Sequence, residues 1–241
     1  MKHSESQEHA CNVSGMFGRI AGCYDFLNHF LSGGMDYWWR HQLVRQITPG
    51  ATGKVLDLAA GTYDVSLEIR RQHPLMQVAA LDYCLPMLTT GKKKLKNPRG
   101  AKVYPAQADG RALPLADNSV DCATIAFGIR NIIPREEAFR EILRVLQPGG
   151  RLCVLEFGSG KNKVWKGLYN FYLQHALPVI GKIFSGDDAA YKYLADTIIA
   201  FPDATELAME MRQAGFERVF HRPLTSGIVQ LHVAQKAVTE E

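Results

Sequence analysis

The sequence has few cysteines, and their arrangement excludes two common uses of that residue. There are five of them, they are scattered, and no two are separated by only two other residues. Zinc sites and disulfide frameworks both need cysteines paired at short or regular spacings. We therefore expect a reducing compartment and no metal site. The five are Cys11, Cys23, Cys84, Cys122 and Cys153.

Long apolar runs and a strong charge of one sign are also missing. No apolar stretch approaches the roughly 20 residues that a membrane-spanning helix needs, and the polar N-terminal segment lacks the apolar core of a secretory signal. Lysine and arginine number 28 against 24 aspartates and glutamates, a balance that gives little support to a nucleic-acid partner. We expect a cytoplasmic protein that binds no nucleic acid.

What the chain does contain is an ordinary globular composition, with strands and helices alternating through its middle. The residues are 46% hydrophobic and 22% charged, which suits one domain with a sizeable core. Short apolar runs predict buried strands, and segments with helical spacing lie between them. The predicted strands are 54–59, 77–81, 102–106, 121–126 and 151–156, and the predicted helices are 65–72, 86–96 and 136–146.

Two more regions complete the predicted fold. Segments 217–224 and 228–236 alternate in polarity and predict an antiparallel hairpin joined at 225–227. Segments 16–46 and 163–213 are aromatic and helical in spacing, and the first is broken at 32–34. The whole order is typical of an α/β fold with a mostly parallel seven-stranded sheet and an antiparallel C-terminal hairpin strand.

The loop after the first predicted strand has the features of a nucleotide-type cofactor site. In LDLAAGTYDV at 56–65, small residues let a ligand approach the backbone, and Asp82 follows the next strand, where an acid can hold a ribose diol. The GxGxxG pattern of a dinucleotide site is absent. Asp57 and Asp64 would repel a pyrophosphate but attract the cationic amino and sulfonium groups of S-adenosylmethionine. The loop thus favours a methyl donor over NAD, although Asp57 could equally accept backbone N–H groups.

Several blocks of sequence match, in order, the signatures of one enzyme family. They are YDFLNHFLSGGMDYWW at 24–39, AFGIRN at 126–131, RVLQPGGRLCVLEF at 144–157, YNFYLQHALPVIG at 169–181, AYKYLADTIIAFP at 190–202, AGFERV at 214–219 and LTSGIVQLH at 224–232. Over nearly its whole length the chain resembles the C-methyltransferases of menaquinone and ubiquinone biosynthesis.

The resemblance implies a fold and a reaction. The fold is that of a Rossmann-like class I methyltransferase that depends on S-adenosylmethionine, and the reaction methylates a ring carbon of a polyprenylated quinol, such as demethylmenaquinol. Carried over by position, the cofactor contacts are Gly61, Thr62, Asp82, Asp109 and Gly110. We expect Asp82 to hold the ribose and Asp109 to bracket the adenine. Gly61 and Thr62 would pass under the methionine moiety.

Arg130 and Asn131 are the predicted catalytic residues. An arginine beside an asparagine can stabilise a quinol oxygen as it loses its proton, directly or through water. No histidine or glutamate is an obvious base. The alternative is structural, with Arg130 forming a salt bridge to the neighbouring helix and Asn131 capping that helix.

The resemblance also implies a layout for the chain. We expect a flexible polar tail at 1–15 and a single methyltransferase domain at 16–241, with a helical lid at 16–50 and a helical substrate wall at 160–213. On the lid, Tyr24, Asp25 and Asn28 are candidate substrate contacts, although aromatic stripes are more often core. Tyr169, Phe171, Tyr172 and Tyr193 would line the isoprenoid chain. A homodimer and a peripheral contact with the inner face of the membrane remain open.

Five positions depart from the family pattern. Tyr63 replaces a glycine, and we expect its ring to turn away from the cofactor and a Tyr63→Gly variant to bind the cofactor more tightly. The departures also motivate a second hypothesis, a weakened homologue that acts as a binding partner in quinone synthesis. A third is a methyltransferase acting on another lipophilic or phenolic acceptor. The other departures are Asp36 for histidine, Ala126 and Gly158 for serine, and Gln147 for a basic residue.

Overall fold

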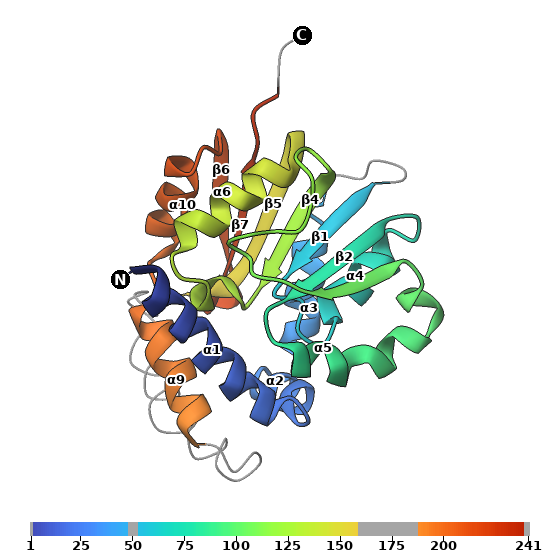
Figure 1. Cartoon of the computed structure of the whole chain (residues 1–241), viewed down its shortest axis with the longest axis vertical. Coiled ribbons are helices and arrows are strands. Elements are labelled where there is room, and N and C mark those ends of the chain that lie inside the picture. The colour runs from blue at the N-terminus through green and yellow to red at the C-terminus, as the bar shows by residue number, and fades with distance from the viewer. Residues whose placement is uncertain (1, 48–52, 159–187, 239–241) are drawn as a thin grey trace.

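A seven-stranded sheet forms the centre of the protein. The computed structural model describes residues 2–47, 53–158 and 188–238 (Figure 1). The strand order is β3-β2-β1-β4-β5-β7-β6; β1 to β5 run parallel to one another, whereas β7 runs antiparallel to β5 and β6. This confirms the predicted fold class. The strands are β1 Lys54–Leu58, β2 Gln77–Asp82, β3 Val103–Gln107, β4 Val120–Ala126, β5 Leu146–Phe157, β6 Arg218–Leu224 and β7 Val229–Gln235.

Helices cover both faces of the sheet, because successive strand residues point to opposite sides. In β1, Leu56 packs with α6 and α10 in one apolar core, and Val55 packs with α3 and α4 in another. The helices of the two layers are α3 Met35–Val44, α4 Asp64–Gln72, α6 Arg135–Val145 and α10 Ala204–Gln213. Shorter helical segments are α5 Leu85–Gly91, η1 Lys92–Lys96, η2 Pro98–Gly100, η3 Ile129–Asn131 and η5 Thr225–Gly227.

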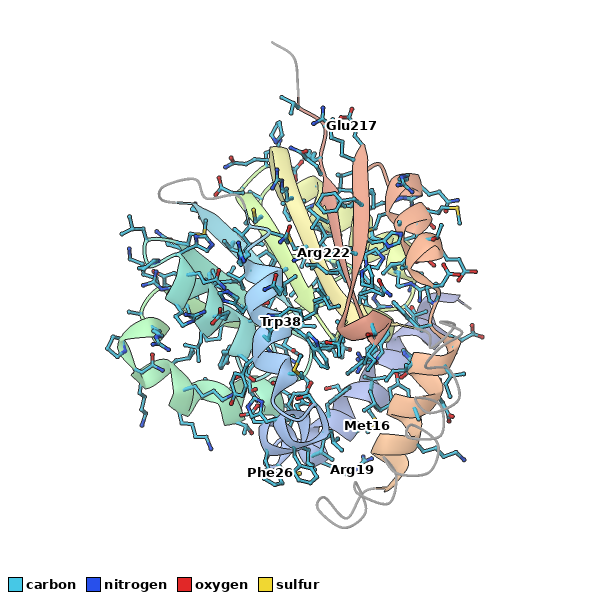
Figure 2. The ribbon with its side chains drawn as sticks, turned by 180° about the vertical axis from the view of Figure 1, so that it is seen from behind. Met16, Arg19, Phe26, Trp38, Glu217 and Arg222 are labelled. Atoms are coloured by element: carbon cyan, nitrogen blue, oxygen red, sulfur yellow. The ribbon has the colours of Figure 1, made fainter. Side chains whose placement is uncertain are left out.

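Three further helices, α1 Lys2–Ile20, α2 Tyr24–Leu31 and α9 Asp188–Ala200, gather at the carboxyl ends of the parallel strands. Seen from behind, Met16 and Phe26 lie at the end of the molecule opposite Glu217, which precedes β6 (Figure 2). Met16 and Leu27 pack with Ile198 in a small apolar cluster. The break between α2 and α3 falls at 32–34, as expected, and both Gly33 and Gly34 have left-handed backbone there.

The expected tail at 1–15 is not a separate segment. It belongs to α1, a single helix of 19 residues, so the boundary expected at residue 16 falls inside a helix. The helix is anchored further along by Met16 and Ile20, and the carbonyl oxygen of Ser14 accepts a hydrogen bond from Cys84 Sγ at 3.3 Å. A polar composition does not prevent helix formation when the next turns of the same helix are packed.

Part of the expected substrate wall lies outside the described residues. Within 160–213 the structure describes α9 and α10, whereas Tyr169, Phe171 and Tyr172 fall in the undescribed part. In the described ranges, none of the helices combines the length and the apolar character that crossing a membrane requires.

Candidate functional site

A cavity opens at the carboxyl ends of the parallel strands. Segments that follow β1, β2, β3 and β4 line one side, and α1 and α2 line the other with Phe17 and Tyr24. The chain leaves β1 toward β2 and β3 and then returns to β4 on the opposite side of β1. The cavity therefore lies at the topological switch point, where open α/β sheets bind their ligands.

Asp82 is held in place at the edge of the cavity by the backbone of two loops. Its carboxylate accepts the N–H of Gly61 at 2.7 Å and the N–H of Cys84 at 2.7 Å. Burial raises the pKa of Asp82 above its usual range, and these two hydrogen bonds oppose the shift. Both Asp82 and Gly61 line the cavity. The remaining lone pairs of the carboxylate can accept the two hydroxyls of a ribose.

Asp57, in contrast, is a structural acid. It is 1% exposed, does not line the cavity, and accepts the hydroxyls of Ser66 at 2.5 Å and Thr124 at 2.9 Å. Burial raises its pKa to about 6, against the effect of both hydrogen bonds. These contacts tie β1 to β4 and to the first turns of α4. Of the two alternatives that the sequence left open, the structure supports the second, since Asp57 accepts a backbone hydrogen bond from Ser66, at the start of α4, in addition to the two side-chain hydroxyls.

The loop 59–63, between β1 and α4, places its two largest side chains, Thr62 and Tyr63, away from the cavity. Thr62 is buried, and its hydroxyl donates to Asp25 Oδ1 at 2.5 Å on α2. Tyr63 has left-handed backbone, with φ of 72°, and its buried hydroxyl donates to the carbonyl oxygen of Leu88 at 2.7 Å. The ring does turn away from the cavity, as expected, but it enters the core against Gly91. Burial raises the pKa of Tyr63 to about 12.

The far end of the cavity contains the predicted adenine contacts. Asp109 and Gly110 both line it, and the Arg111 guanidinium pairs with Asp109 Oδ2 at 2.7 Å. A side chain at Gly110 would meet Leu58 at 3.1 Å and Ile132 at 3.2 Å, so glycine keeps this wall open. Tyr83, Met87, Ile132 and Ile133 also line the cavity and were not predicted. Tyr83 directly follows Asp82, and Ile132 directly follows Asn131. Their position next to predicted site residues is the sequence signal that could have identified them.

The two predicted catalytic residues have different surroundings. Asn131, at the end of η3, lines the cavity, and its Oδ1 accepts the hydroxyl of Tyr193 on α9 at 3.2 Å. Arg130 does not line the cavity. Its Nη1 donates to Glu156 Oε1 at 2.6 Å and to the carbonyl oxygen of Phe127 at 2.7 Å.

The pair of Arg130 and Glu156 is almost fully buried, with side chains 4% and 1% exposed. The guanidinium also lies 5.7 Å from the centre of the Phe157 ring. Because a buried carboxylate needs a cation beside it, the burial of Glu156 accounts for the direction in which Arg130 points. The structure thus gives Arg130 a structural ion pair, as the alternative held, but the partner lies on strand β5 and not on the neighbouring helix.

The lid residues also divide. Tyr24 lines the cavity, whereas Asp25 and Asn28 do not. Burial raises the pKa of Tyr24, while a hydrogen bond with Asn28 lowers it. Asp25 instead faces Thr62 and Lys94, which lies 2.7 Å from Asp25 Oδ2. Asn28 therefore contacts the cavity-lining Tyr24, and Asp25 contacts the loop after β1.

The donor set of the cavity suits S-adenosylmethionine. Asp82 offers free acceptor capacity for a ribose, Gly61 allows close approach, and apolar side chains such as Met87 and Ile132 offer a flat surface for a purine. Among the described residues, no group of three histidine, cysteine, aspartate or glutamate side chains could hold a metal ion.

Comparisons of sequence agree with this geometry. Residues 1–236 match the model of the ubiE/COQ5 methyltransferase family. A ubiquinone/menaquinone biosynthesis C-methyltransferase from Syntrophotalea carbinolica is 46% identical over 217 residues, which are 90% of this chain and 91% of the relative. The demethylmenaquinone methyltransferase of Porphyromonas gingivalis is 39% identical over 226 residues, covering 93% of this chain and 92% of the relative.

Comparisons of structure support the fold. A methyltransferase from Thermotoga maritima that depends on S-adenosylmethionine superposes with a TM-score of 0.65 at 19% identity, covering 93% of this chain and 99% of the other. The [4+2]-cyclase SpnF superposes with a TM-score of 0.70 at 16% identity, covering 94% and 96%. Because one of these neighbours is named a cyclase, the fold by itself does not determine the reaction.

Proposed function

The chain belongs to the ubiE/COQ5 methyltransferase family, and we propose that it methylates a ring carbon of a polyprenylated quinol, such as demethylmenaquinol, with S-adenosylmethionine as the methyl donor. One observation carries the proposal. The family match spans every segment that lines the cavity, from α1 to the segment after η3. The match therefore covers the site itself as well as the sheet.

We place the cofactor along the strand ends. Asp82 holds the ribose hydroxyls, Asp109 and Gly110 lie beside the adenine, and Gly61 leaves room for the methionine end. Thr62 contributes indirectly, because its hydroxyl is used by Asp25. Bound there, S-adenosylmethionine supplies an electrophilic methyl group. The residues of the chain have to orient the quinol carbon and exclude water.

Asn131 is the residue that we assign to the quinol oxygen. Because Tyr193 donates to Asn131 Oδ1, the amide nitrogen of Asn131 is left to donate toward the cavity. A donor at this position stabilises the negative charge that a quinol oxygen carries while the neighbouring carbon attacks the methyl group. Tyr24 offers a second donor, since its raised pKa keeps the phenol protonated at neutral pH. Arg130 touches neither ligand and supports the η3 turn.

A polyprenyl tail is lipophilic, so we also propose that the protein works at the inner face of the membrane as a peripheral, cytoplasmic enzyme. Tyr37 and Trp38 of α3 support this contact, because they are 61% and 43% exposed and Trp38 lies on the outer surface (Figure 2). Exposed aromatic side chains favour the interface between water and lipid. A homodimer stays a prediction.

The alternative of a weakened binding partner loses part of its basis in the structure. Tyr63 leaves the cavity free. A Cβ atom at Gly158 would lie 2.4 Å from the carbonyl oxygen of Gly227, which belongs to η5 just before β7. Because the backbone of η5 approaches so closely, only glycine fits at position 158. Neither departure damages the cavity.

Two measurements test the proposal. S-adenosylmethionine is first titrated into the protein in a calorimeter, and absence of heat up to millimolar ligand would overturn it. The protein is then incubated with the cofactor and a reduced demethylmenaquinone in detergent, and we expect the quinol mass to increase by one CH2 unit. Binding without this product, together with methylation of a simpler phenol, would favour the alternative acceptor.

A further inference from the structure

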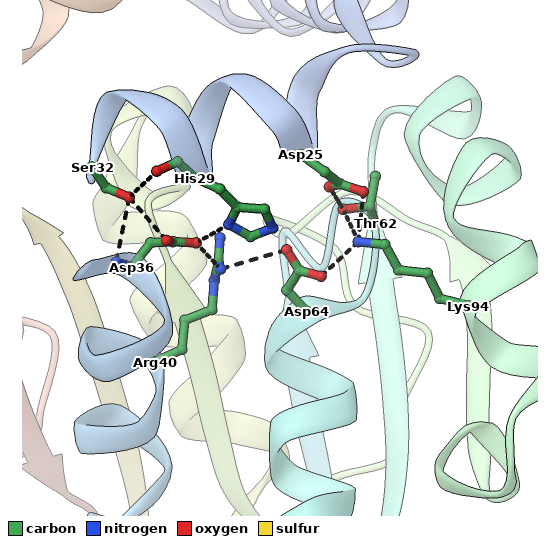
Figure 3. A network of polar contacts seen from close by, with 8 residues as sticks. All are labelled: Asp25, His29, Ser32, Asp36, Arg40, Thr62, Asp64 and Lys94. Atoms are coloured by element: carbon green, nitrogen blue, oxygen red, sulfur yellow. Dashed lines mark hydrogen bonds and ion pairs between the residues drawn. The ribbon is translucent and has the colours of Figure 1, made fainter. Parts of the chain in front are cut away.

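Helices α1 and α2 form the roof of the cavity, and residues 59–63, after β1, form the cofactor loop. A network of polar side chains joins the roof to the cofactor loop (Figure 3). The network links α2, α3, the loop after β1, the start of α4, and η1. Helix α2 contributes Tyr24 to the cavity, and the loop contributes Gly61. The network therefore connects two elements that line the cavity. Its members are Asp25, His29, Ser32, Asp36, Arg40, Thr62, Asp64 and Lys94.

Lys94 is the residue at which three of these elements meet. Its Nζ lies 2.7 Å from Asp25 Oδ2 on α2, 2.6 Å from Asp64 Oδ1 at the start of α4, and 3.1 Å from Thr62 Oγ1 in the cofactor loop. An ammonium group has three donors, and each has an acceptor here. The side chain of Lys94 is 21% exposed, and those of Asp25 and Asp64 are 27% and 21% exposed. The three charged groups are therefore partly exposed to solvent.

The other lysines of the same short helix do not share this environment. Lys92, Lys93 and Lys96 are exposed, as expected of a solvated face. Lys94 alone among them turns toward the loop and the roof. Lys93 therefore provides a matched control for the removal of one positive charge from η1.

The rest of the network holds Asp64, the carboxylate that pairs with both Lys94 and Arg40. Arg40 Nη1 forms an ion pair with Asp64 Oδ2 at 3.5 Å and donates a hydrogen bond to Asp36, which is 2% exposed. His29 Nδ1 lies 2.6 Å from Asp36 Oδ2, which joins the end of α2 to α3. The pKa of Asp36 lies below its usual range. Burial acts to raise it, but the effects of Arg40, Ser32 and His29 together outweigh the effect of burial. Asp64 is thus held from both sides, by Lys94 and by Arg40.

We propose that Lys94 is a positioning residue that keeps the roof helix α2 seated on the cofactor loop. By binding Asp25, Thr62 and Asp64 together, it maintains the spacing between Tyr24 and Gly61 across the cavity. It touches no ligand itself. The inference rests on the proposed function for the identity of the cofactor, and its effect is on cofactor affinity rather than on the chemical step.

The test is the affinity of S-adenosylmethionine for Lys94→Met, which keeps the length of the side chain and removes its charge. We expect the Kd to rise about 10-fold, a typical size for coupling between elements of a site, while kcat at saturating cofactor stays within about twofold. Lys93→Met should leave both unchanged. Lys94→Arg, which retains the charge, should recover part of the affinity.

A double-mutant cycle shows whether Lys94 acts through the roof. Asp25→Asn alone should also raise the Kd, and the double variant should be no weaker than the worse single variant, because both remove the same link. Hydrogen exchange in α2 should increase in Lys94→Met. A Kd equal to that of Lys93→Met, or two losses that multiply, would overturn the proposal. Asp25→Asn keeps it testable if Lys94→Met does not fold.

Failure of this inference is distinguishable from failure of the proposed function. The inference is read as the difference in Kd for S-adenosylmethionine between the wild type and the Lys94, Lys93 and Asp25 variants, whereas the proposed function is read on the wild type alone, as cofactor binding followed by methylation of a quinol. A wild-type protein that binds the cofactor but does not methylate the quinol would overturn the acceptor assignment. The role of Lys94 could still be tested in that case, because the Kd measurements on its variants do not use the quinol.

Discussion

The two sides of the cavity are held together by different forces. The sheet side consists of loops at strand ends, whose backbone groups are fixed by the ladder beneath and by buried pairs such as Arg130 with Glu156. The roof side consists of α1 and α2, which pack through a small apolar cluster and are joined to the loop by half-exposed ion pairs. Buried pairs are costly to break, whereas exposed ones contribute little. We therefore expect substitutions of the buried groups on the sheet side to change stability, and substitutions of groups that face the ligand or join the roof to the loop to change ligand affinity or turnover.

The largest expected effect is on the sheet side. Glu156→Gln leaves the Arg130 guanidinium buried without its counter-charge, and we expect a loss of about 3–5 kcal/mol in the free energy of unfolding. Denaturant titration measures it, with the exposed Glu217→Gln as the control. A loss below about 1 kcal/mol would mean that the pair is not the anchor of the η3 turn.

A pH effect of similar size comes from Asp57. The pKa is about 6 in the folded protein, above the value of about 4 in an unfolded chain. Between these values the unfolded chain loses the proton while the folded protein keeps it, so stability falls as pH rises. Relative to Asp57→Asn, we expect the wild type to lose roughly 3 kcal/mol between pH 3 and pH 7. Parallel stability curves for the two proteins would contradict the assignment.

Tyr63→Gly tests the cofactor loop itself. The ring is fully buried and its hydroxyl is bonded to Leu88, so we expect a loss of about 2–4 kcal/mol in the free energy of unfolding, reduced slightly because glycine prefers the left-handed backbone. Affinity for S-adenosylmethionine should not improve. Tyr63→Phe, which keeps the ring, should lose about 1 kcal/mol. Tighter cofactor binding by the glycine variant would instead support the expectation from the sequence that Tyr63 weakens cofactor binding.

Asp82→Asn removes the charge that we assign to the ribose. We expect the Kd for S-adenosylmethionine to rise about 30-fold, or about 2 kcal/mol, because hydrogen bonds to a charged group are the stronger kind. Calorimetric titration at a temperature where the variant is folded gives the value. The exposed Asp196→Asn on α9 is the control, and equal affinity in the two variants would remove Asp82 from the site.

The smallest expected effect is at the contact between α9 and η3. Tyr193→Phe frees Asn131 Oδ1 and lets the amide rotate, so we expect kcat to fall about 3- to 10-fold, which corresponds to roughly 1 kcal/mol. The KM for the cofactor should stay the same. Tyr104→Phe, at an exposed position in β3, serves as the control. An unchanged kcat would show that Asn131 needs no orientation or has no part in the reaction.

The strands along the chain and the acid after the second strand were predictable, because a buried strand and the loop after it leave local patterns in the sequence. Asp82 was expected at the site for that reason, and Asp109 and Gly110 from the family resemblance; all three line the cavity. The direction of a side chain within one turn leaves no such pattern. Arg130 and Asn131 are adjacent, yet one is paired with Glu156 and the other lines the cavity.

Taken by itself, the sequence determined the parallel sheet, its antiparallel end and the family, since periodicity, small-residue loops and ordered motifs are all local signals. Only the tertiary structure decided which groups meet across long separations in the chain. Lys94 meets Asp25, Tyr63 reaches Leu88, and the polar residues before position 16 continue a packed helix. The physical reason is that an ion pair or a buried hydroxyl needs a partner in space, and partners far apart in sequence become visible only when the chain has folded.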